Sequence, residues 1–250
     1  MGAAYLLINN NNSRTKFALA DPDRLGEARA VVETASLDAA LLAKITAGWE
    51  FERVALASVV PAKAAVIREF WSAHPVLEVS HRLHLGLTLD LPDPSAVGAD
   101  RLANVAAVVG LGEPLPCIVV DFGTAVTCNV VSAEKAFLGG IIAPGLSAMT
   151  DYLHDRTALL PKIQIEEPRE VIGKSTRTAM LSGVVYGYRG LIQELLRQVE
   201  RELTGGTRHV RTVATGGYAE LLAAQIPAID AVFPDLTLDG IRIIANLNPR

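Results

Sequence analysis

Short apolar runs bounded by polar, glycine or proline residues recur along the chain. Residues 4–8 form a run typical of a buried strand, residues 9–13 are polar, and a second apolar run resumes at residues 17–20. Two strand-like runs joined by a short polar stretch predict a β-hairpin at the start of the chain.

The next hundred residues alternate between helical and strand-like spacing. The pattern predicts helices over 37–49 and 62–71, a strand over 53–60 closed by Pro61, a strand near 77–79, and a helix over 100–111 with Asp100 near its start. This alternation is typical of an α/β protein and not of a β-sandwich.

The second half of the chain repeats the first. Residues 117–120 and 126–131 predict two more strands, and between them Asp121, Gly123 and Thr124 match Asn9, Asn11 and Asn12 when one half is laid on the other. The repeat predicts two related lobes, residues 1–116 and 117–250. A long helix over 176–203 and a strand-loop-helix element over 210–225, with Thr215, Gly216 and Gly217 in its loop, complete the pattern.

Composition excludes several classes of protein. Half of the 250 residues are apolar, yet no apolar run reaches the roughly 18 to 20 residues of a membrane span, and no basic segment precedes the first apolar run. The net charge of −4 and the lack of a basic cluster argue against nucleic acid as a partner. We therefore expect a cytoplasmic protein, with Cys117 and Cys128 as buried free thiols.

The polar loops carry the candidate chemistry. A strand that ends in a carboxylate followed by Gly and Thr places an anion, an accessible backbone and a hydroxyl on one turn, which suits a polyphosphate. One such loop is more often an ordinary turn. Two related loops and a Gly-Gly loop before a helix favour instead the two-lobed ATPase fold of actin, sugar kinases and heat-shock chaperones, with duplicated strand-loop-strand phosphate-binding units.

An ordered series of motifs resembles one family of this fold, the type III pantothenate kinases, from residue 6 to about residue 248. Each motif is weak alone, but their order and spacing agree. The matching segments are residues 12–19, 58–61, 98–104, 121–125, 139–145, 173–176, 215–217 and 234–240.

The resemblance implies ATP-dependent phosphorylation of pantothenate to 4′-phosphopantothenate, the first step of coenzyme A biosynthesis. It implies Asp100 as the catalytic base, Asp121 at a metal site, and a homodimer that uses Mg²⁺ and a monovalent cation (K⁺ or NH₄⁺). The residues implied to bind pantothenate are Gly98, Ala99, Asp100, Arg101 and Thr176. Those implied to bind ATP are Asn9, Asn10, Asn11, Asn12, Ser13, Arg14, Thr15, Lys16 and Thr124.

Structural roles compete with these assignments. Without the resemblance, Asp100 is best interpreted as the N-cap of the following helix, with Arg101 solvated, and Asp121 as a carboxylate that stabilises a turn. The chain also departs from the family pattern, because Asn9 stands where an Asp is usual and Asn11 where a Gly is usual. Asn11 is tolerable because Asn accepts positive φ.

The loss of the first carboxylate has a functional consequence. A neutral amide attracts Mg²⁺ less than a carboxylate does, so nucleotide binding with slow turnover is expected. Leu91, Val126 and Asn129 replace a Tyr, a Thr and an Asp that are usual in the family. A second hypothesis follows, a catalytically degenerate family member that acts as a ligand-binding or regulatory protein.

Overall fold

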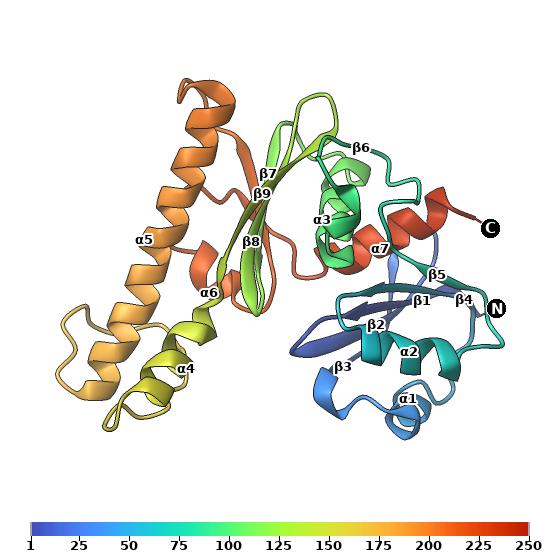
Figure 1. The fold of residues 1–250 in the computed structure, drawn as a ribbon, viewed down its shortest axis with the longest axis horizontal. Coiled ribbons are helices and arrows are strands. Elements are labelled where there is room, and N and C mark those ends of the chain that lie inside the picture. The colour runs from blue at the N-terminus through green and yellow to red at the C-terminus, as the bar shows by residue number, and fades with distance from the viewer. Residues whose placement is uncertain (1, 250) are drawn as a thin grey trace. The chain divides into compact units, whose positions relative to one another are not determined.

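A computed structural model describes residues 2–249 and divides them into two compact units (Figure 1). The first unit comprises residues 2–113, 134–138 and 235–249, and the second comprises residues 114–133 and 139–234. This differs from the expected division into residues 1–116 and 117–250, because the C-terminal helix packs against elements of the first unit.

The first unit is built on a five-stranded sheet in the order β3-β2-β1-β4-β5. Its strands are β1 (Ala3–Asn10), β2 (Arg14–Ala20), β3 (Leu25–Glu33), β4 (Phe51–Ser58) and β5 (Val76–Glu78). β1, β2 and β3 form an antiparallel meander, which confirms the predicted hairpin, whereas β4 and β5 run parallel to β1.

Helices cover both faces of this sheet (Figure 1). They are α1 (Ala39–Ile45), α2 (Pro61–Phe70), α3 (Ala99–Gly110) and α7 (Leu236–Leu247), with short 3-10 turns at Thr34–Ser36 and Pro94–Ala96. α1 is shorter than the helix predicted over 37–49. It starts after the N-cap Asp38, which accepts a hydrogen bond from Leu41 N at 2.7 Å, and the chain turns at Gly48, whose φ is +78°.

Alternation along β1 divides the core of the first unit in two. Leu7 packs with residues of α3 and α7 on one face, whereas Leu6 and Ile8 pack with residues of α1 and α2 on the other. Because all three side chains are fully buried, the strand reads as a continuous apolar run and not as an alternation of apolar and polar residues.

The second unit repeats the strand order of the first. Its strands are β7 (Cys117–Phe122), β8 (Ala125–Val131), β9 (Ala136–Pro144), β10 (Arg211–Thr215) and β11 (Ala231–Val232), in the order β11-β10-β7-β8-β9. β7 pairs antiparallel with β8 and parallel with β10, as β1 does with β2 and β4. The start of β9 belongs to the first unit, where it pairs with β6 (Thr88–Leu89).

Three helices belong to the second unit: α4 (Leu146–Arg156), α5 (Thr176–Thr204) and α6 (Ala219–Ala223). α5 matches the predicted long helix. It starts with a capping box between Ser175 and Thr178, and it ends at Gly205 in the left-handed conformation. Its buried residues Val184, Tyr188 and Ile192 recur every four positions and join a core with side chains of β7 and β8.

Two further features of the chain are its cysteines and the length of its helices. Cys117 and Cys128 are buried free thiols, and burial raises the pKa of the Cys128 thiol to about 11. In the part of the chain that the structure describes, no helix is long and apolar enough to cross a membrane.

Candidate active site

The polar loop between β1 and β2 is held together by buried hydrogen bonds. Asn11 N donates to Arg14 O at 3.2 Å and closes the turn. Asn10 donates through Nδ2 to Thr15 Oγ1 at 2.7 Å and accepts from Ser58 Oγ at 2.7 Å. Thr34 Oγ1 lies 2.9 Å from Thr15 Oγ1 and donates to Asn11 O at 2.6 Å.

This network divides the residues expected to bind ATP into two groups. Asn10 and Thr15 are fully buried, so their side chains fix the shape of the loop and are not open to a ligand. Asn12, Ser13 and Arg14 are exposed, and Lys16 is half-buried. Within this loop, the exposed side chains of residues 12–14 are therefore the ones accessible to a nucleotide.

Asn9 and Asn11 each bury a side-chain oxygen that has no hydrogen-bond partner in the structure. A buried carbonyl oxygen without a partner is costly and, in a native structure, requires an explanation such as a missing ion or ligand. The backbone at Asn11 has no positive φ. Among residues 2–249, Lys135 is the only non-glycine residue with a positive φ. The ability of Asn to adopt a positive φ is therefore not needed at Asn11.

Asp100 lies in the first turn of α3. The N-cap is Gly98 and not Asp100, so the capping role that competed for this carboxylate is excluded. Asp100 Oδ1 accepts a hydrogen bond from Arg101 N at 2.8 Å. Burial raises the pKa of the Asp100 carboxyl, and the hydrogen bond and the charge of Arg101 only partly oppose this shift.

The turn with Asp100 adjoins the loop with Asn10 in the first unit. Val59 N donates to Asn10 O at 3.1 Å, and a Cβ atom added to Gly98 would lie 3.4 Å from Val59 Cγ1 and 2.6 Å from Asp100 Oδ1. Because β1 and β4 are parallel, their carboxyl ends meet at one edge of the sheet, where ligands of α/β proteins bind. The structure thus brings together two segments that lie ninety residues apart in the sequence.

Arg101 is half-buried beside Asp100. Its guanidinium lies over the ring of Phe137, 5.4 Å from the centroid. Burial lowers the pKa of Arg101, although the Asp100 charge opposes the shift. The expected solvated alternative for Arg101 is therefore wrong. Phe137 is a neighbour of Arg101 that the sequence did not indicate, because no local pattern links residues 101 and 137.

In the second unit, the turn between β7 and β8 lies against two glycines from other segments, Gly145 and Gly216. Gly123 N donates to Ala125 O at 3.1 Å within the turn, and Gly145 N donates to Thr124 O at 3.2 Å. A Cβ atom on Gly145 would lie 2.3 Å from Thr124 O, so only glycine fits here. Asp121 is half-buried and Thr124 is exposed.

Gly216 approaches the same turn from the end of β10. Thr215 is in register with Asp121, and a Cβ atom on Gly216 would lie 2.6 Å from Asp121 Oδ1. The φ of Gly216 is +96°, which also favours glycine. The turn at 121–124 is therefore flanked by two backbone segments that approach it too closely for any residue larger than glycine.

Thr176 is the first residue of α5, and its side chain is exposed. Ser175 and Thr178, on either side, form the capping box, so Thr176 is not needed for capping.

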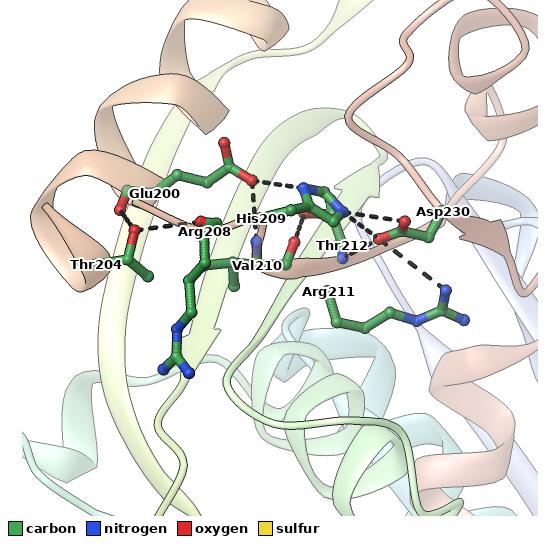
Figure 2. A network of polar contacts seen from close by, with 8 residues as sticks. All are labelled: Glu200, Thr204, Arg208, His209, Val210, Arg211, Thr212 and Asp230. Atoms are coloured by element: carbon green, nitrogen blue, oxygen red, sulfur yellow. Dashed lines mark hydrogen bonds and ion pairs between the residues drawn. The ribbon is translucent and has the colours of Figure 1, made fainter. Parts of the chain in front are cut away.

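A second polar cluster in this unit surrounds His209 (Figure 2). Its Nδ1 lies 2.8 Å from Glu200 Oε1, and its Nε2 lies 3.0 Å from both carboxylate oxygens of Asp230. The hydrogen bond with Asp230 raises the pKa of His209. No group of three or more His, Cys, Asp or Glu side chains suited to hold a metal ion occurs among residues 2–249.

The repeated strand order and the paired turns define a two-lobed α/β ATPase fold of the actin and sugar-kinase type. An inorganic polyphosphate/ATP-glucomannokinase from Arthrobacter sp. strain KM has a TM-score of 0.51 at 15% identity, with 98% of this chain and 99% of that chain covered. A Campylobacter jejuni protein assigned to the Baf family of transcriptional activators has a TM-score of 0.64 at 18% identity, with 98% of both chains covered. At these identities the likeness shows the fold alone.

Sequence comparison identifies the family. The profile of the family "Type III pantothenate kinase" matches residues 5–198. A type III pantothenate kinase of Akkermansia muciniphila is 48% identical over 245 residues, which cover 98% of this chain and 99% of the relative. The chain belongs to the type III pantothenate kinase family, as the ordered motifs indicated.

Proposed function

We propose that this chain transfers the γ-phosphoryl group of ATP to the primary hydroxyl of pantothenate and so forms 4′-phosphopantothenate in the first step of coenzyme A biosynthesis. Membership of the family supports the reaction. The observation in the structure that carries it best is the carboxylate of Asp100 in the first turn of α3, next to Gly98, whose backbone lies close to Val59; Val59 in turn donates a hydrogen bond to Asn10 O at the end of β1.

Asp100 acts as the proton acceptor. In a loose phosphoryl transfer the attacking alcohol loses its proton late, so a carboxylate in position is a sufficient base. Partial burial raises the pKa of Asp100 and makes it a better acceptor than a solvated carboxylate. Gly98 allows the carboxylate to lie close to the backbone, where a Cβ atom would collide with Oδ1.

Arg101 binds the carboxylate of pantothenate. A guanidinium forms two parallel hydrogen bonds to a carboxylate, and the ring of Phe137 restricts its orientation. The backbone of Gly98 and Ala99 and the hydroxyl of Thr176 supply the remaining polar contacts to this substrate.

The two turns bind the phosphates of ATP. Thr124 is an exposed residue on a turn whose neighbours Gly145 and Gly216 carry no side chain. The second phosphate-binding segment is the loop between β1 and β2. It offers the exposed side chains of Asn12, Ser13 and Arg14, the side chain of Lys16, and the backbone of Asn9, Asn10, Asn11 and Thr15.

The oxygen atoms around these turns suit hard cations. In the second unit, Asp121 is the residue that would hold a cation, Mg²⁺ or a monovalent cation (K⁺ or NH₄⁺), with phosphate oxygens; in the first unit, Asn9 Oδ1 is a separate oxygen without a partner. Mg²⁺ usually binds through few protein ligands and through substrate phosphates. When bound, the cation neutralises charge on the transferred phosphoryl group.

A homodimer and a cytoplasmic location, where ATP is available, complete the proposal. The outer face of α5 supports the dimer, because Gly183, Gly187 and Gly190 have open space around them and the neighbouring Tyr186 and Leu191 are exposed apolar side chains.

A pantothenate phosphorylation assay tests the reaction. The native chain, Asn9→Asp and Asp100→Asn are incubated with pantothenate, MgATP and K⁺, and phosphopantothenate is quantified by mass spectrometry. We expect product from the native chain, more from Asn9→Asp because a carboxylate restores attraction for Mg²⁺, and a loss of about 10²-fold or more from Asp100→Asn. Equal trace product from all three proteins would contradict the proposal.

A further inference from the structure

Two consecutive residues of α5, Tyr188 and Arg189, are buried polar side chains that the mechanism above does not use. They are 1% and 5% exposed, respectively. Buried polar groups need partners, and the partners of these two residues lead to the two glycine segments that flank the turn at 121–124.

Tyr188 reaches the first of these segments. Its hydroxyl donates to Pro144 O at 3.0 Å. Pro144 immediately precedes Gly145, whose N–H donates to Thr124 O. A chain of two hydrogen bonds and one peptide unit thus connects the middle of α5 to Thr124.

The hydroxyl of Tyr188 is not required for packing. The buried positions of α5 at the same spacing are Val184, Ile192 and Leu196, all of them apolar. A phenylalanine ring would fill the volume of the tyrosine ring without the cost of burying a hydroxyl. The hydrogen bond to Pro144 is therefore the specific contribution of tyrosine at this position.

Arg189 reaches the second segment. Nη1 and Nη2 donate to the two carboxylate oxygens of Glu167 at 3.0 and 2.6 Å, and Nη2 also donates to Leu221 O at 2.7 Å. Leu221 belongs to α6, which begins at Ala219 immediately after the loop with Gly216. Glu167 is about half exposed and holds the guanidinium in place from the loop before α5.

α6 is in turn connected to the turn at 121–124. Tyr218 N donates to Phe122 O at 3.4 Å, and Ala219 N donates to Gly216 O at 3.2 Å. Arg189 thus fixes α6 through Leu221 O, and the first residues of α6 fix the loop that packs on Asp121.

We propose that Tyr188 and Arg189 are positioning residues that hold Gly145 and Gly216 against the turn at 121–124 and thereby set its affinity for the phosphates of ATP. This inference rests on the proposed function, because it assumes that ATP binds at this turn. Neither residue touches the reacting atoms.

The first test compares Tyr188→Phe with Tyr152→Phe, whose hydroxyl lies on α4 and whose side chain is 66% exposed. We expect the KM for ATP to rise roughly three- to tenfold in Tyr188→Phe, because one buried hydrogen bond is lost and Pro144 O is left without its partner. The KM for pantothenate at saturating ATP stays within about twofold, and Tyr152→Phe behaves as the native chain.

The second test compares Arg189→Lys with Arg197→Lys. Arg197 lies on the same helix and forms a similar two-pronged pair, but with the exposed Glu194 on the surface. Lysine keeps the charge and cannot bridge Glu167 and Leu221 with a planar fork. We expect the dissociation constant for ATP to rise in Arg189→Lys and to stay native in Arg197→Lys. It is measured by calorimetry in the absence of pantothenate, so that ATP is not consumed. Glu167→Gln provides a milder version of the same change if Arg189→Lys folds poorly.

The readouts separate positioning from general stability. A purely structural role predicts a lower melting temperature with unchanged KM and dissociation constant for ATP, and that result would overturn the inference. If the native chain itself does not bind ATP, the proposed function fails and the inference with it. If the native chain binds ATP and turns over pantothenate while Tyr188→Phe and Arg189→Lys match it in ATP affinity, only the inference fails.

Discussion

Gly145→Ala directly tests whether the turn at 121–124 binds the nucleotide. Gly145 is the N-cap of α4, and its backbone has φ −71° and ψ 168°, which alanine adopts without strain. The added methyl group, however, would lie 2.3 Å from Thr124 O and 2.6 Å from Gly123 O. The effect of this substitution is therefore steric and acts on the turn.

The size of the effect follows from these distances. Thr124 O has to move by about 0.7 Å to reach the 3.0 Å below which real Cβ contacts are essentially absent. Overpacking of this kind costs about 1–3 kcal/mol, and replacing glycine gains about 0.4–1 kcal/mol from the unfolded state. A net loss of about 1–2 kcal/mol corresponds to a melting temperature lower by about 2–8 °C in a chain of this length.

The catalytic effect is larger than the effect on stability. A displacement approaching 1 Å at a substrate-positioning group costs on the order of 10²-fold in rate. We expect kcat/KM for ATP to fall by about 10- to 100-fold in Gly145→Ala, measured with an ADP-coupled assay below the melting temperature.

Glu202→Ala is the control. Glu202 is an exposed residue of α5 that belongs to neither turn and is not among the residues assigned to the dimer face, so alanine there leaves kcat/KM unchanged. A Gly145→Ala protein that is destabilised but keeps native kcat/KM for ATP would refute the assignment of the turn to nucleotide binding.

Three further predictions concern single side chains. Burial raises the pKa of Asp100, so above the unperturbed pKa of about 3.9 the native state binds more protons than the unfolded state. The free energy of unfolding therefore falls as pH rises through this range. Thermal scans should show that Asp100→Asn gains stability over the native chain from pH 4 to pH 7. The hydrogen bond with Asp230 raises the pKa of His209, so its contribution to stability is complete below the unperturbed pKa of about 6.5 and is lost as pH rises through the folded pKa. In denaturant titrations, the stability of His209→Gln should not fall over this pH range as that of the native chain does. Gly216→Ala should weaken ATP binding in calorimetry, because its methyl group would lie 2.6 Å from Asp121 Oδ1 and its φ of +96° disfavours alanine; unchanged affinity would contradict the proximity of this loop to the phosphates.

Local patterns predicted the elements well. The hairpin of β1 and β2, the repeat of that hairpin in β7 and β8, and the long helix α5 follow from apolar runs, polar turns and helical spacing within short stretches of chain. The repeated strand order follows from the repeated sequence pattern, and the ordered motifs alone indicate the family.

Contacts between distant segments were beyond such patterns. The C-terminal helix belongs to the first unit because its apolar residues pack with α3, and nothing in its own sequence specifies that neighbour. In the same way, Phe137 meets Arg101, and Thr34 completes the network of Asn10 and Thr15, through tertiary packing alone.

Local sequence alone also does not settle the backbone conformation at two positions, the N-cap of α3 and Asn11. Asp100 resembles an N-cap because carboxylates often occupy that position, yet Gly98 caps α3 and leaves the carboxylate in the first turn. Asn11 replaces a usual glycine, but the turn there needs no positive φ. Both results bear on the site, because they leave Asp100 available for chemistry and Asn11 with an unpartnered oxygen.

A crystal structure with a non-hydrolysable ATP analogue and pantothenate would test most directly whether Asp100 and the two turns serve a single reaction. We predict that the γ-phosphate contacts the turn at 121–124 and the loop at 9–14, and that the pantothenate hydroxyl lies within hydrogen-bond distance of the Asp100 carboxylate. Pantothenate bound away from Asp100, or a nucleotide with its phosphates outside both turns, would contradict the assignment.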